Sequence, residues 1–148
     1  MNKTEIKEYA KKEWVPIIRE QSAIFLCDYV KKHNPQSILE IGTAIGYSGI
    51  LMLENSAAKL TTIEINKDSF ELAKQNFCDA GFESRVEMFC DDAKNVFEKL
   101  NKKFDLVFLD GPKGQYLSYL PILKGLLNEG GTLIVDDVFY HGWVKGED

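Results

Sequence analysis

The sequence lacks the long apolar run that a membrane-spanning helix would need. In its 148 residues no such run approaches the roughly 20 residues of a membrane span. The N-terminal stretch MNKTEIKEYAKKEW is charged along its length, so we expect no secretory signal peptide. Internal repeats, low-complexity tracts and linkers are also missing from the sequence. We therefore expect a single cytoplasmic domain, residues 1–148, with no membrane partner.

Cysteine and positive charge are scarce as well. The three cysteines, Cys27, Cys78 and Cys90, are an odd number without the spacing of a metal site. We expect them to be reduced thiols in the core of a cytoplasmic protein. The net charge of −5 gives no support for nucleic-acid binding, although a local basic patch is compatible with an acidic total.

What the sequence contains is a regular alternation of strand and helix patterns. Short runs rich in Ile, Val, Leu, Thr and Phe predict strands at residues 37–41, 59–65, 85–89, 104–110 and 131–137. Apolar residues at helical spacing predict helices at about residues 3–12, 19–33, 66–81 and 115–131. This alternation predicts an α/β fold with a mostly parallel sheet. In such a sheet ligands bind beyond the carboxyl ends of the strands.

The first predicted strand leads into a glycine-rich turn. The segment SILEIGTAIGYSGI places glycines at Gly42, Gly46 and Gly49. A dinucleotide fingerprint needs a glycine where this chain has Ala44, and a phosphate loop needs a G-K-[ST] ending that is missing. Glu40, just before the turn, would also repel a phosphate. The pattern favours a ligand that carries positive charge and no phosphate.

Acidic residues follow the other predicted strands. Glu64 lies 22 positions beyond Gly42, where an acid can accept hydrogen bonds from a ribose diol. Asp92 and Ala93 follow the third strand. S-adenosylmethionine fits this set, because carboxylates attract its sulfonium and ammonium, while N–H groups near Tyr47 and Ser48 can meet its carboxylate. The alternative is that these residues only form tight turns and helix caps.

Asp110, Asp136 and Asp137 form a second acidic group. They lie at the ends of two strands that we expect to be neighbours, about 4.8 Å apart. Carboxylates held together raise each other's pKa, and a hard divalent cation such as Mg²⁺ relieves that repulsion. The alternative is that Asp136 or Asp137 caps the next helix or turn.

Lys113 follows Asp110 on the same predicted loop. A neighbouring metal and a cationic cofactor would disfavour its charged form, which suits a general base. The alternative is an ordinary solvated lysine.

These motifs resemble those of the magnesium- and S-adenosylmethionine-dependent O-methyltransferases of the catechol and caffeoyl-CoA type, especially the bacterial ones. The resemblance covers residues 9–145 and is carried by EIGTAIGYS, TTIEIN, LDGPKGQY and DDVFYHG. It implies a Rossmann-like class I methyltransferase fold, a three-layer αβα sandwich. The family's sheet has an antiparallel strand pair after the fifth strand. This chain ends soon after that strand, so we expect a C-terminally truncated domain without the pair and with an exposed sheet edge.

The resemblance also implies roles for individual residues. Lys113 would be the base, with Asp110 beside it in catalysis, and Asp110, Asp136 and Asp137 would be the metal ligands. The family usually has Asp-Asn at the last two positions, and the added charge here should tighten metal binding. The implied cofactor contacts are Ile17, Glu40, Gly42, Thr43, Gly46, Tyr47, Ser48, Glu64, Ile65, Asp92, Ala93 and Asp110.

Within the family, EYAKKEWVPIIREQ and ILEIGTAIGYSGI resemble most a bacterial group that methylates the 5-hydroxyl of 5-hydroxyuridine in tRNA. That resemblance implies a tRNA partner, and a homodimer, since bacterial members are commonly dimers. A ring hydroxyl beside a carbonyl is a chelating pair, as a catechol is. The alternatives are a small catechol-like or caffeoyl-CoA-like substrate, and an inactive cofactor-binding fragment. An NAD-dependent oxidoreductase is disfavoured by the missing glycine.

Overall fold

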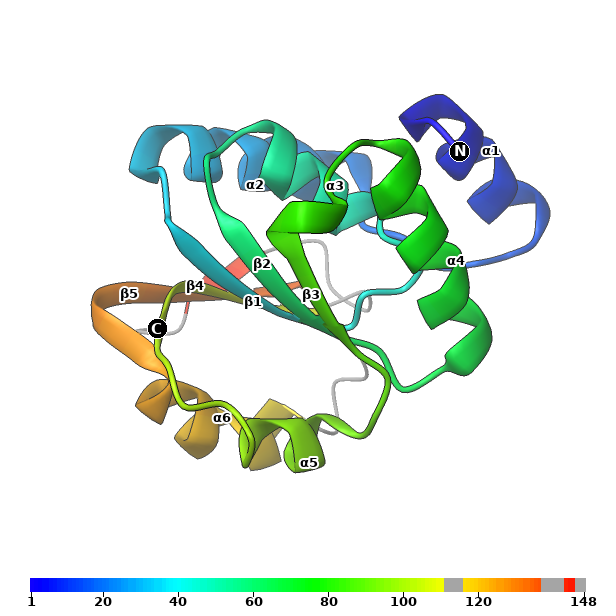
Figure 1. Ribbon diagram of the computed structural model, residues 1–148. Helices are drawn as coiled ribbons and strands as arrows, with labels where there is room; N and C mark the ends of the chain where they lie inside the picture. The colour runs from blue at the N-terminus through cyan, green and yellow to red at the C-terminus, as the bar shows by residue number, and fades with distance from the viewer. Residues whose placement is uncertain (111–115, 137–142, 146–148) are drawn as a thin grey trace.

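The computed structural model describes residues 1–110, 116–136 and 143–145. In this part of the chain a sheet lies between two layers of helices (Figure 1). One face of the sheet is covered by α1 (Lys3–Lys12), α2 (Glu20–His33), α3 (Tyr47–Glu54) and α4 (Lys67–Asp79). The other face is covered by α5 (Ala93–Phe97) and α6 (Tyr116–Gly125). The predicted α/β sandwich is confirmed.

The sheet has six strands in the order β3-β2-β1-β4-β5-β6. The strands are β1 (Ser37–Ile41), β2 (Lys59–Ile63), β3 (Val86–Phe89), β4 (Phe104–Asp110), β5 (Leu127–Asp136) and β6 (Trp143–Lys145). The first five are parallel, and β6 runs antiparallel to β5. The chain leaves β1 toward β2 on one side, and β4 lies on the other side. The topological switch point, where such folds bind ligands, is therefore between β1 and β4.

The C-terminal part differs from the prediction in two places. The helix pattern predicted over residues 115–131 ends at Gly125, and β5 begins at Leu127 rather than at residue 131. Pairing of Phe104 with Leu127 draws this segment into the sheet, and the register shifts between Phe104 and Leu106. The outer edge of β5, expected to be exposed, is paired over three residues by β6. Sheet pairing thus overrides the local helical pattern, as tertiary context often does.

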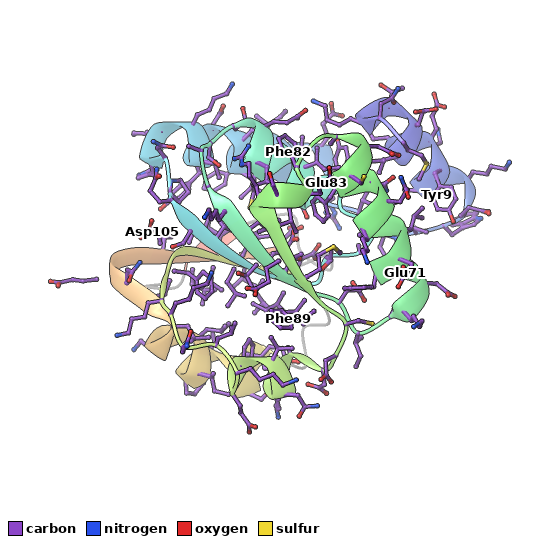
Figure 2. The ribbon with its side chains drawn as sticks, in the orientation of Figure 1. Tyr9, Glu71, Phe82, Glu83, Phe89 and Asp105 are labelled. Carbon is purple, nitrogen blue, oxygen red and sulfur yellow. The ribbon has the colours of Figure 1, made fainter. Side chains whose placement is uncertain are left out.

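Alternation along the strands divides the core into two halves. Ile38, Leu60 and Phe108 face the α1–α4 layer, where they join a cluster with Leu26, Met52 and Phe77. The other half, against α5 and α6, is built from Leu39, Ile63, Val107, Val135 and Tyr119. Phe89 at the end of β3 lies on this second side (Figure 2). In β4, residues an even number of positions from Phe108 therefore point toward the α1–α4 layer.

Two predictions for small residues need correction. Gly49 lies inside α3, and a Cβ there would be 2.8 Å from the ring of Phe77, so this glycine lets α3 pack closely on α4. Cys78 and Cys90 are exposed rather than in the core, and Cys27 is half-buried. Among the described residues no helix is long and apolar enough to cross a membrane.

Candidate functional site

The turn after β1 needs glycine at two positions. Gly42 has φ +98°, and a Cβ on it would lie 1.9 Å from the backbone carbonyl oxygen of Asp110. Gly46 has φ +94° and caps the N-terminus of α3. The N–H groups of Gly42 and Thr43 both donate to the carbonyl of Ile63, at 2.9 and 3.2 Å. The turn is thus held tightly between the ends of β2 and β4, at the switch point.

Glu40 is a fully buried carboxyl directly below this turn. It has no exposed surface, and it accepts hydrogen bonds from the hydroxyls of Ser48 and Thr62. Burial raises the pKa of the Glu40 carboxyl to about 7, and the two hydroxyl donors lower it only in part. The nearby Glu64 carboxyl raises that pKa further. A cation next to Glu40 would relieve this cost, because it favours the ionised form.

Glu64 follows β2 and its carboxylate turns back toward the glycine turn. One oxygen accepts from the N–H of Ala44 at 2.7 Å and the other from the N–H of Asn66 at 2.9 Å. Asn66 in turn caps α4 through the N–H of Ser69. These bonds fix the direction of the carboxylate while leaving lone pairs for further donors. Ile65, predicted as a cofactor contact, is next to it and 69% exposed.

Asp92 and Ala93 stand at the start of α5, beyond β3. The Asp92 side chain accepts from the N–H of Lys94 at 2.9 Å, so it is the N-cap of α5. Helix capping, which the sequence left open as the alternative, is the role seen at this position. Ala93 is buried against the second half of the core.

Asp110 and Asp136 end neighbouring strands and are paired in register. Asp110 is two residues after Phe108, which is paired with Glu40, and Asp136 is paired with Asp110. Both carboxyl groups therefore face the same side of the sheet as Glu40. Ser22 of α2 donates a hydrogen bond to Asp136 at 3.3 Å. Burial raises the pKa of the Asp110 carboxyl to about 8, and repulsion from Asp136, Glu40 and Glu64 adds to the increase.

Paired carboxyl groups of this kind fit a hard divalent cation, which prefers oxygen ligands. The third predicted ligand, Asp137, and the predicted base, Lys113, lie outside the described residues. Within residues 1–110, 116–136 and 143–145 no group of three possible metal-binding side chains comes together. The described residues therefore bring two of the three predicted metal ligands, Asp110 and Asp136, side by side.

Ile17 and Tyr47 lie together on a groove beside the glycine turn. The groove has a volume of about 330 Å³ between the α1–α2 connection, α2 and the start of α3. Lys7, Glu20 and Asp28 also line it, although most of its surface is apolar. The predicted cofactor contact at Ile17 is thus placed near Tyr47, the first residue of α3.

The structure brings together most of the predicted residues and adds two that the sequence did not single out. Glu40, Gly42, Thr43, Gly46, Ser48, Glu64 and Asp110 gather at the switch point through the contacts above. Thr62 and Ser22 were missed, although each bonds a predicted carboxyl group. Threonine is common in strands, so nothing in the local pattern marks Thr62.

The arrangement suits a ligand with positive charge and hydroxyl groups. Four carboxyl groups, those of Glu40, Glu64, Asp110 and Asp136, lie at the carboxyl ends of the strands, and repulsion among them contributes to the raised pKa values of Glu40 and Asp110. Asp105, the second residue of β4, lies at the opposite, amino end of the strands (Figure 2). A cationic centre at the carboxyl ends of the strands would meet this group of buried and half-buried carboxyl groups.

Comparison with known proteins gives consistent results. A family model described as O-methyltransferase matches residues 2–148. Bovine (Bos taurus) catechol O-methyltransferase is 32% identical over 141 residues, which are 89% of this chain and 52% of that protein. The chain therefore spans about half the length of this curated relative.

Solved structures agree with these sequence matches. A proposed caffeoyl-CoA O-methyltransferase from Staphylococcus aureus has a TM-score of 0.87 and 34% identity, covering 96% of this chain and 69% of that one. The O-methyltransferase TomG from Streptomyces achromogenes, solved in complex with SAM, has a TM-score of 0.83 and 25% identity. That match covers 92% of this chain and 65% of TomG.

Proposed function

Because the chain belongs to the O-methyltransferase family, we propose that it transfers a methyl group from S-adenosylmethionine to a hydroxyl oxygen. The observation that carries this proposal is the convergence of buried carboxyl groups on the glycine turn. Glu40 and Asp110 have pKa values raised to about 7 and 8, mainly by burial. A carboxyl group is costly to ionise in such a place unless a cation joins it.

The described residues suggest how the cofactor would lie. The ammonium of its methionine end would meet Glu40, whose carboxyl is already oriented by Ser48. The ribose hydroxyls would donate to Glu64, which keeps free lone pairs beside its two backbone donors. The adenine would lie toward Asp92 and Ala93 at the start of α5. This order follows the strands from β1 to β2 to β3.

The acceptor hydroxyl would be activated at the ends of β4 and β5. Asp110 and Asp136, with Asp137, would hold a divalent cation, which when bound acidifies a coordinated hydroxyl. We assign proton removal to Lys113 on the strength of the family resemblance. The oxygen would then form its bond to the methyl carbon as the bond from that carbon to sulfur breaks, which would leave S-adenosylhomocysteine. In-line alignment of oxygen, carbon and sulfur would provide most of the rate gain.

We favour a small hydroxylated aromatic substrate, of the catechol or caffeoyl-CoA kind. The support is that two of the relatives named above are a catechol O-methyltransferase and a proposed caffeoyl-CoA O-methyltransferase. Methylation of 5-hydroxyuridine in tRNA, suggested by the sequence resemblance, finds no support among these relatives. It becomes an outcome of the substrate test.

The first test is calorimetric titration of the chain with S-adenosylmethionine, with and without Mg²⁺. We expect binding that weakens at least tenfold in Glu64→Gln, because one oxygen then becomes an amide donor that cannot accept from a ribose hydroxyl. Glu83→Gln is the matched control, since Glu83 is exposed at the opposite end of the sheet (Figure 2). No binding by the unchanged chain, or equal binding by both variants, would contradict the proposed cofactor site.

The second test identifies the substrate. The chain is incubated with labelled S-adenosylmethionine and Mg²⁺ together with catechol, caffeoyl-CoA, or tRNA that contains 5-hydroxyuridine. We expect methylation of a small substrate and none of the tRNA. Methylation of the tRNA alone would replace our substrate assignment with the tRNA one. Cofactor binding without any methyl transfer would identify the chain as an inactive cofactor-binding fragment.

A further inference from the structure

Thr62 on β2 makes a buried contact with Glu40 on β1. The two residues are paired in the parallel register of the strands, and neither has any exposed surface. The Thr62 hydroxyl donates to Oε1 of Glu40 at 2.7 Å. The Ser48 hydroxyl, on α3, donates to Oε2, so each carboxylate oxygen has its own hydroxyl donor.

A second hydroxyl extends this contact into the glycine turn. Thr43 Oγ1 lies 2.6 Å from Thr62 Oγ1, and Thr43 is also buried. A hydroxyl carries only one hydrogen. When Glu40 is ionised, Thr62 must give its hydrogen to Glu40, so Thr43 must donate to Thr62. The turn, the strand and the carboxylate are therefore joined in one directed chain of hydrogen bonds.

We propose that Thr62 is a positioning residue, whose hydroxyl holds the Glu40 carboxylate toward the methionine end of S-adenosylmethionine. This inference rests on the proposed function. Thr62 does not need to touch the cofactor, because it acts through Glu40. Its partner Ser48 cannot replace it, because Ser48 bonds the other carboxylate oxygen.

The surroundings of Thr62 show why a hydroxyl at this place needs an explanation. The neighbouring residues of the same face, Ile38 and Leu60, belong to the apolar core under the α1–α4 layer. Valine has nearly the shape of threonine and would pack there without a polar group. A buried hydroxyl is favourable only when it is paired, and this one is paired with the carboxyl that the cofactor site uses.

Removing the Thr62 hydroxyl would change the surroundings of the Glu40 carboxyl. In Thr62→Val, Oε1 of Glu40 would lose its donor in a place that water does not reach. The hydrogen bond from Thr62 lowers the pKa of Glu40, so its loss would disfavour the ionised carboxylate that attracts the ammonium. Thr43 would also lose its acceptor.

The test compares two ligands that differ at the methionine end. S-adenosylmethionine carries the ammonium, whereas 5′-methylthioadenosine has the same ribose and adenine but no amino-acid part. We expect Thr62→Val to weaken the binding of S-adenosylmethionine about tenfold and the binding of methylthioadenosine less than about twofold. Thr62→Ser, which keeps the hydroxyl, should restore affinity to within about threefold of the unchanged chain.

Thr61→Val is the matched control, because Thr61 is equally buried but points to the opposite face of β2. It should leave both affinities within about twofold. Equal weakening of both ligands by Thr62→Val would mean a merely structural role and overturn the inference. So would unchanged binding of S-adenosylmethionine by Thr62→Val.

A separate measurement distinguishes failure of this inference from failure of the proposed function. NMR titration of the Glu40 side chain in the ligand-free protein should show a higher midpoint in Thr62→Val than in the unchanged chain. An unchanged midpoint would overturn the inference even if S-adenosylmethionine binds. If the midpoint rises but the unchanged chain binds no S-adenosylmethionine, the proposed function fails and the assignment of a cofactor role to Thr62 fails with it.

Discussion

Replacing Gly42 by alanine should destabilise the protein more than the same change at Gly81, Gly125 or Gly130, where a Cβ would meet nothing within 4 Å. A Cβ at Gly42 would lie 1.9 Å from the carbonyl oxygen of Asp110, so the turn and the end of β4 must separate by roughly 1 Å. This overpacking costs about 1–3 kcal/mol. The positive φ of +98° adds about 1–2 kcal/mol for a residue with a side chain. We expect Gly42→Ala to lower the free energy of unfolding by roughly 2–5 kcal/mol.

Gly81→Ala separates the two contributions. Gly81 has φ +81°, but a Cβ there would meet nothing within 4 Å. Gly81→Ala should therefore lower the free energy of unfolding only by the cost of the positive φ, about 1–2 kcal/mol. The assay is urea unfolding followed by circular dichroism, with equal m-values required for the comparison. Gly42→Ala should also weaken S-adenosylmethionine binding, whereas Gly81→Ala should not. Equal losses of stability in the two variants would refute the close contact between the glycine turn and Asp110.

Three further predictions address charge, capping and packing. Burial raises the pKa of Glu40 to about 7 and that of Asp110 to about 8, above the ordinary values of 4.5 and 3.8 for these side chains. Their stabilising contribution is complete below those lower values and is lost as pH rises through 7 and 8. In metal-free buffer the free energy of unfolding should therefore fall by about 1–3 kcal/mol from about pH 5.5 to 8.5. The fall should be smaller in Asp110→Asn. A free energy of unfolding that does not change with pH would contradict the burial of these carboxyl groups. Asp92→Ala should cost about 1 kcal/mol in thermal unfolding, and Asp92→Asn much less, because asparagine also caps helices; equal losses would show that capping is not its role. Arg85→Ala should cost about 2–3 kcal/mol in urea unfolding without changing cofactor affinity, since its guanidinium donates three hydrogen bonds to backbone carbonyls; a large change in affinity would argue against a purely structural role.

Local patterns were sufficient to predict most of the secondary structure. The short apolar runs predicted β1 and β4 with the residues seen in the structure, because a strand covered on both faces is apolar along most of its length. The pattern failed at residues 126–131, where Leu127, at helical spacing from Leu123, is the first residue of β5. Pairing with β4 decides that segment, and a pairing partner some twenty residues away leaves no mark on local periodicity.

The glycine turn and its acids were also readable from the sequence, because parallel strands bring their carboxyl ends to one edge. Composition and spacing were enough to place Glu40, Glu64 and Asp110 in one site. The chemistry of each residue was not readable. Asp92 proved to be a helix cap, and Gly49 a packing residue against Phe77. The residue type alone does not tell whether an aspartate binds a ligand or caps a helix, or whether a glycine forms a turn or permits close packing.

Only the tertiary structure showed what holds the site together. Thr62 and Ser22 come from different elements, and they meet Glu40 and Asp136 only because strand register and helix docking place them there. The raised pKa values have the same origin, since burial is a property of the folded chain rather than of any residue. The sequence determined which groups stand at the ends of strands, because strand boundaries and the alternation of strand and helix follow from local pattern. The fold decided which of them are buried, paired and charged, because those properties depend on neighbours that are distant in the chain.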